Sequence, residues 1–81
     1  MQTITQTQIE IYKEYLISEE KSEVTVEKYI RDIGAFSRWL DCGELNKTAI
    51  LHYKHRLMEN YAPRTVNSVL ASLNGFFEFN E

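Results

Sequence analysis

The sequence contains few of the residues that cross-link a chain, cradle a phosphate or span a membrane. Among its 81 residues there is one cysteine, Cys42, so no internal disulfide bond can form, and a reducing cytosol is the expected setting. The three glycines are scattered along the chain, which excludes a glycine-rich phosphate loop. No apolar run approaches the roughly 20 residues that cross a bilayer, and the first residues lack the basic-then-apolar pattern of a signal peptide. We therefore expect a cytoplasmic domain without a membrane partner.

The charged residues are unevenly distributed along the chain. Residues 1–23 carry two lysines against five glutamates, whereas residues 46–77 carry four lysines and arginines against Glu59 alone. The net charge of the whole chain is −3, which argues mildly against a nucleic-acid partner. The basic second half argues in the opposite direction, because a block of positive charge suits a polyanion.

Four segments repeat apolar residues with the spacing of a helix, at about residues 6–20, 23–41, 47–60 and 63–79. No segment alternates apolar and polar residues over the length of a strand. The joints between the segments are short, so neighbouring helices should pack antiparallel or crossed around one core. The sequence therefore predicts a single all-α domain over residues 1–81.

Residues that start and stop helices lie at the expected boundaries. Ser22 and Asn46 can cap the second and third helices, since their side-chain oxygens accept from otherwise unpaired backbone N–H groups. Pro63 suits the first turn of the last helix, where a missing N–H has no consequence. Gly43 follows the second helix and is expected to adopt the left-handed conformation that ends it.

Neither a metal site nor a catalytic site is expected in this chain. His52 and His55 lie three residues apart, but no further cysteine or carboxylate stands at a zinc-like spacing from them. The serines lack a recognisable base and an orienting partner for nucleophilic catalysis. No cofactor is predicted.

The 63–79 segment repeats the pattern of the 23–41 segment 40 residues earlier. Thr-Val pairs begin both patterns, and apolar residues then follow at the same spacing: Thr25, Val26, Ile33 and Phe36 align with Thr65, Val66, Leu73 and Phe76. Any two amphipathic helices share such a core pattern. The matched Thr-Val pairs favour a second interpretation, in which both helices enter the same kind of surroundings by their N-terminal ends.

Residues 65–77 contain no charged residue, although a surface helix normally carries lysine and glutamate. Arg64, Ser68 and Ser72 are spaced to form one outward line, with Asn67 beside it. Short hydroxyl side chains let a helix approach a grooved partner closely, and asparagine is suited to adenine. The unpaired N–H groups and the positive dipole at a helix N-terminus favour phosphate. A helix in the major groove of DNA, a protein interface and a plain solvated face all remain open at this point.

The order of these motifs resembles the N-terminal core-binding domain of tyrosine recombinases, the phage integrase family. The resemblance covers nearly the whole chain and rests on a Tyr-Leu pair, a Ser-x-x-Thr-x-x-x-Tyr stretch, a Phe-x-x-Trp-Leu helix end, and a Pro-x-Thr-Val helix that ends in paired aromatics. In this sequence they are Tyr15-Leu16, Ser22 to Tyr29, Phe36 to Leu40, and Pro63 to Phe77.

The resemblance implies a compact four-helix orthogonal bundle, SAM-like, that grips double-stranded DNA at a recombination half-site. It implies that the second and fourth helices approach the major groove. The DNA contacts carried over to this chain are Thr25, Lys28, Arg31, Arg64, Thr65, Asn67, Ser68 and Ser72.

The resemblance also implies that the catalytic residues belong to a separate catalytic domain of the same chain, which these 81 residues do not contain. That domain and other recombinase protomers would be partners, and this chain would not be an enzyme by itself. The five tyrosines of the chain are expected to pack in or beside the core rather than to act as the nucleophile. The alternative is a helical protein-interaction domain in which the same two helices dock on a partner.

Overall fold

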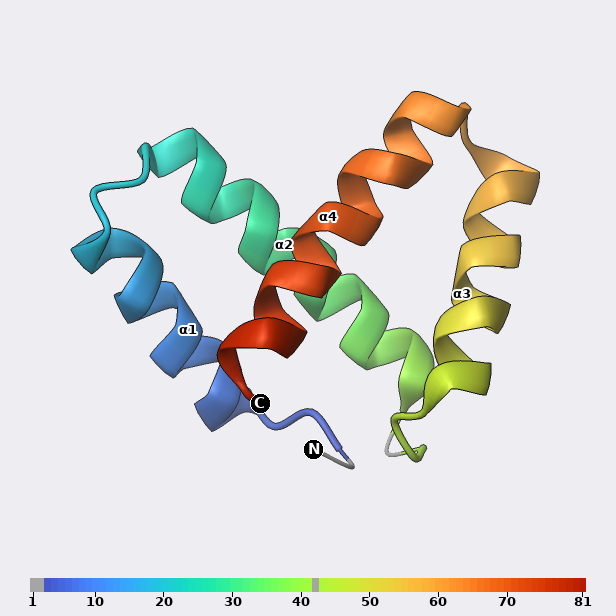
Figure 1. The fold of residues 1–81 in the computed structure, drawn as a ribbon, viewed down its shortest axis with the longest axis horizontal. Coiled ribbons are helices and arrows are strands. Elements are labelled where there is room, and N and C mark those ends of the chain that lie inside the picture. Colours follow the sequence, from blue (N-terminus) through green and yellow to red (C-terminus); the bar gives the residue numbers. More distant parts are fainter. Residues whose placement is uncertain (1–2, 42) are drawn as a thin grey trace.

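The computed structural model describes residues 3–41 and 43–81 (Figure 1). The chain forms four helices: α1 (Gln6–Ser18), α2 (Glu23–Leu40), α3 (Lys47–Asn60) and α4 (Pro63–Phe79). The predicted all-α fold is confirmed, and the predicted ends of the helices differ from the observed ones by two residues at most. Cys42 lies outside the described residues. Nowhere in the described part of the chain is a helix long and apolar enough to cross a membrane.

The N-terminal ends of the first three helices are held by side-chain caps. The hydroxyl of Ser22 accepts from the Thr25 N–H, and the side chain of Asn46 accepts from the Ala49 N–H, so both predicted caps are confirmed. Thr5 adds a reciprocal cap with Gln8 at the start of α1. These bonds satisfy N–H groups that no helix can pair internally, and they define where each helix begins.

Two residues with a left-handed backbone end α1 and α2, and neither is a glycine. Glu20 follows α1 with a φ of 60°, and Asp41 follows α2 with a φ of 44°. The expectation that Gly43 is left-handed is wrong, because no described glycine has a positive φ. A Cβ at Gly43 would lie 2.7 Å from the carbonyl oxygen of Leu40. The glycine therefore allows close approach of the backbone.

Figure 1 shows the arrangement of the helices. Helices α2 and α4 cross near the middle of the molecule, with α1 and α3 at opposite ends of its longest axis. Helix α2 packs against α1 and α4, and α3 packs against α4. Both α2 and α4 begin at the upper edge of the view, whereas the two ends of the described chain lie at the lower edge. The N-terminal ends of the two crossed helices therefore lie along the same edge of the fold, that of α2 at the end beside α1 and that of α4 at the end beside α3.

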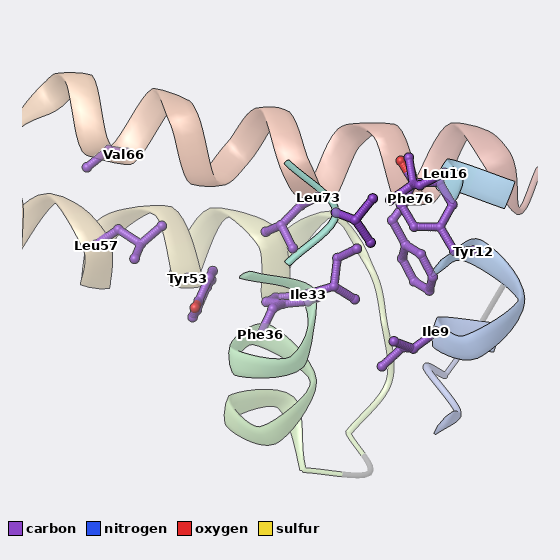
Figure 2. Packing of buried hydrophobic residues seen from close by; sticks show 11 residues of the cluster. Ile9, Tyr12, Leu16, Ile33, Phe36, Tyr53, Leu57, Val66, Leu73 and Phe76 are labelled. Atoms are coloured by element: carbon purple, nitrogen blue, oxygen red, sulfur yellow. The ribbon is translucent and has the colours of Figure 1, made fainter. Parts of the chain in front are cut away.

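The core is built where the two crossed helices meet. Ile33 and Phe36 of α2 lie against Leu73 and Phe76 of α4, and all four are at most 1% exposed (Figure 2). Aromatic rings from the outer helices close the core on either side. Tyr12 of α1 meets Phe76 edge to face at 5.4 Å between ring centroids, and Tyr53 of α3 meets Phe36 in the same way at 4.9 Å.

The crossing explains the repeat in the sequence. The apolar residues that align at an offset of 40 are buried in both helices: Val26 with Val66, Ile33 with Leu73 and Phe36 with Phe76. At the crossing itself, aligned residues meet each other, because Lys28 bonds to the carbonyl oxygen of Ser68 and Asp32 to the hydroxyl of Ser72. When two helices are related by an approximate two-fold axis, residues close to that axis contact their own counterparts on the other helix. The repeat therefore reflects how α2 and α4 pack.

Candidate nucleic-acid interface

The candidate site is the upper edge of the fold, where α2 and α4 begin (Figure 1). We call residues 23–31 and 63–67 together the tip surface. Four of the residues proposed from the sequence are exposed on this surface: Arg31 halfway along α2, and Arg64, Thr65 and Asn67 in the first turns of α4. Within the part of the chain that the structure describes, neither arginine forms an ion pair. Their guanidinium groups are therefore available to an anion.

The two helix ends at the tip surface differ in how their backbone N–H groups are satisfied. In α2, the Ser22 hydroxyl accepts from the Thr25 N–H and donates to the Thr25 hydroxyl. In α4, the N-cap residue is Ala62, which has no side chain to accept a bond, and Pro63 occupies the first turn as predicted. The first turn of α4 therefore presents its N–H groups and the positive end of the helix dipole without a side-chain cap.

A polar cluster lies at the crossing of α2 and α4, and its central residue, Lys28, belongs to the α2 part of the tip surface. The ammonium group of Lys28 donates to Asp32 Oδ2 at 2.6 Å, to Ser72 Oγ at 3.1 Å and to the carbonyl oxygen of Ser68 at 3.2 Å. The Ser72 hydroxyl lies 2.8 Å from Asp32 Oδ2 and donates to it. An ammonium group has three donors, and all three are used here.

This cluster changes the surroundings expected for three of the proposed contact residues. Ser72 was expected on an outward line, but it is fully buried at 0% exposure, and Ser68 is half-buried. Lys28 is half-buried and its donors are occupied by the cluster. The physical reason is that α2 crosses α4 over this line, and the short serine side chains allow the two backbones to approach. The packing of α2 against α4 therefore explains why short uncharged side chains stand at Ser68 and Ser72.

The carboxylates near the tip surface have different surroundings. Asp32 is turned inward, with 12% of its side chain exposed, and its charge is paired with Lys28. Glu23 and Glu27 are exposed on α2. Because carboxylates repel phosphate, the α2 side of the tip surface is less favourable for a polyanion than the α4 side.

A small hollow beside the α4 tip was missed by the sequence reasoning. It has a volume of about 200 Å³ and lies between the end of α3 and the start of α4. Its lining includes Lys54, Met58, Tyr61, Pro63 and Asn67. Lys54 and Met58 stand four residues apart on α3, so its periodicity held a signal that these two share a face.

The buried tyrosines have no features of a nucleophile. Burial raises the pKa of the Tyr12 and Tyr53 hydroxyls above the ordinary value for tyrosine, and the neighbouring Asp32 carboxylate raises that of Tyr53 further. A raised pKa disfavours the phenolate that would attack phosphorus. Over residues 3–41 and 43–81, no three histidine, cysteine, aspartate or glutamate side chains gather as a metal site would require.

The fold defines a small all-α domain of four helices with two crossed helices at its centre. The family model described as phage integrase, N-terminal SAM-like domain, matches residues 9–81, and the chain belongs to this family. Comparisons with curated proteins and with solved structures found no match.

Proposed function

We propose that this domain binds duplex DNA through the tip surface and grips the recombination site for a tyrosine recombinase. Membership of the integrase family supports this function, and the observation that carries it is the shared edge. Two crossed helices begin along one edge of the fold. Arg64 and Thr65 are exposed in the first turn of α4, and Arg31 is exposed halfway along α2. Helix N-termini and arginines are the groups that hold phosphates.

The contacts divide into two chemical kinds. Arg31 and Arg64 would pair with phosphates, and Thr65 with the open N–H groups of α4 would hold one more. Asn67 is exposed one turn along α4 and is the residue suited to a base edge. Thr25 has a hydroxyl that its cap with Ser22 leaves free to donate. Lys28, Ser68 and Ser72 would position the two helices rather than touch DNA.

The domain would work beside a catalytic domain of the same protein, which would cut and rejoin the strands, and beside other recombinase protomers. A DNA partner of this kind implies the cytoplasm as the working compartment. The domain itself would supply binding and orientation and no catalytic group. Its net charge of −3 implies modest and salt-sensitive affinity when it is alone.

A titration with generic duplex at two salt concentrations tests this function. A phosphate-binding domain loses affinity with salt, with a log–log slope of about −0.9 per phosphate neutralised. The double variant Arg31→Ala/Arg64→Ala should make the slope shallower by roughly 1.8 on the same scale. Lys47→Glu makes the same change in net charge at an exposed position at the start of α3, away from the tip surface, and is the matched control. No binding at low salt, or equal effects of the two variants, would reject DNA binding through the tip surface and favour a protein partner.

A further inference from the structure

A groove between α2 and α3 carries positive charge that the proposed function has not used. It has a volume of about 640 Å³ and is bounded by the C-terminal half of α2 and the C-terminal half of α3. Arg38 stands on the α2 wall and Arg56 on the α3 wall, and both side chains are exposed. The residues that line it include Trp39, Tyr53, Asn60 and Tyr61, and no aspartate or glutamate.

The two arginines are not neutralised by the protein itself. Among residues 3–41 and 43–81, neither forms an ion pair with a carboxylate. In addition to burial, the Asp32 carboxylate raises the pKa of Tyr53, which lines the groove. That carboxylate is already paired with Lys28. In a chain with a net charge of −3, a groove with two free guanidinium groups and no lining carboxylate is complementary to an anion.

The groove is continuous with the tip surface on both walls. On α2, Arg31, Ala35 and Arg38 are spaced so that they lie along one face of the helix. On the other wall, Tyr61 lines both this groove and the hollow that contains Asn67. An anion that extends from the tip surface along either wall therefore meets the two arginines of the groove.

We propose that this groove is a second phosphate-binding site, which holds the DNA backbone that borders the major groove entered by the α4 tip. The inference rests on the proposed function. The major groove is about 12 Å wide, so a helix tip that enters it has a sugar–phosphate backbone on each side. The groove lies between α2 and α3, beside the α4 tip, and receives one of these backbones. Arginine suits this role because its planar group can bind two phosphate oxygens at once.

The chain contains its own reporter for this site. Trp39 is the single tryptophan of the sequence and lines the groove. Its fluorescence should change when a backbone fills the groove. The tip surface contains no tryptophan, so contact there alone should leave the Trp39 emission unchanged.

The test is a titration of the whole 81-residue chain with generic duplex. The anisotropy of the fluorescently labelled DNA measures affinity, and the emission of Trp39 reports occupancy of the groove. The variant is Arg38→Gln/Arg56→Gln, and the control with the same change in net charge is Lys47→Glu, at an exposed position that does not line the groove. At about 50 mM salt the groove variant should bind on the order of tenfold more weakly, with a salt slope shallower by roughly 1.8, while the control stays within about twofold of the parent. Arg38→Lys/Arg56→Lys, which keeps the charge, should restore most of the slope, and circular dichroism checks that each variant is folded.

Each other outcome overturns the inference in a distinguishable way. If the parent chain binds in a salt-dependent manner but the groove variant behaves like the control, the second site is refuted and the tip surface stands. If the parent chain does not bind duplex at low salt, the proposed function fails and the groove proposal fails with it. If sedimentation shows that the parent chain self-associates and the groove variant does not, while both bind DNA with the same affinity, the groove binds an acidic surface of a second copy instead of DNA.

Discussion

Replacement of Lys28 by methionine tests whether the polar cluster holds α2 and α4 together. Methionine keeps the apolar stem and removes the ammonium group. The change leaves the Asp32 carboxylate, with 12% of its side chain exposed, bonded only to the fully buried Ser72 hydroxyl. It also leaves the carbonyl oxygen of Ser68 without its bond to the ammonium group.

The expected loss of stability lies between two limits. Loss of one partner from a buried ion pair costs about 3–5 kcal/mol, whereas an exposed pair contributes only about 0–1 kcal/mol. The Lys28 side chain is 32% exposed, so solvent screens part of the interaction. We expect Lys28→Met to lower the free energy of unfolding by about 1.5–3 kcal/mol. In a domain of this size each kcal/mol corresponds to about 4–8 °C in Tm, so a fall of about 10 °C is expected.

Thermal or urea unfolding followed by circular dichroism measures this loss. Arg31→Met is the matched control, because Arg31 is exposed on the same helix, and it should change stability by no more than about 0.5 kcal/mol. The double variant Lys28→Met/Asp32→Leu removes both charges and should recover to within about 1 kcal/mol of the parent. If Lys28→Met costs no more than Arg31→Met, the cluster does not hold the crossing, and Lys28 returns as a candidate DNA contact.

Three further changes test local features of the fold by the same unfolding measurements. Glu20→Gly should stabilise the domain by about 0.5–1 kcal/mol, because a glycine relieves the left-handed backbone at a φ of 60°; a loss of stability would mean that this conformation costs nothing. Gly75→Ala places a Cβ 2.8 Å from the hydroxyl of the buried Tyr12 and should lower the free energy of unfolding by about 1–2 kcal/mol. At Gly34 the added Cβ meets only the flexible tip of the Arg38 side chain at 3.3 Å, so Gly34→Ala should stabilise the helix. Equal effects of the two changes would contradict the close approach of Gly75 to Tyr12. Because the pKa values of Tyr12 and Tyr53 are raised, the folded state holds the hydroxyl protons more tightly than the unfolded state does. The free energy of unfolding should therefore be full below the ordinary tyrosine pKa and fall as the pH rises above it. A free energy of unfolding that stays constant through that pH range would refute the burial of the two tyrosines.

The helices could be predicted from the sequence because local rules and packing agree at their ends. Ser22, Asn46 and Pro63 are favoured at helix starts for reasons that act within one turn, and all three begin helices here. Gly43 was assigned the wrong role because Asp41 adopts the left-handed conformation two residues earlier. Sequence alone does not show which residue of a short joint takes the strain.

The candidate site was only partly predictable. Arg31, Arg64 and Asn67 are exposed as expected, since each lies opposite the apolar stripe of its helix. Ser68 and Ser72 also lie off that stripe, yet a second helix covers them. A polar residue outside the stripe faces either solvent or a polar helix crossing, and periodicity does not separate the two. The repeat at an offset of 40 held the missing information, because it aligned the residues that meet at the crossing.

The most direct test of the central claim is a map of backbone amide chemical shifts in the labelled domain as generic duplex is added at low salt. Binding through the shared edge of α2 and α4 predicts that the amides of residues 23–31 and 63–67 move, while those at the starts of α1 and α3 stay in place. Shifts confined to the exposed face of α1 would contradict the account. The absence of any shift at low salt would contradict it equally.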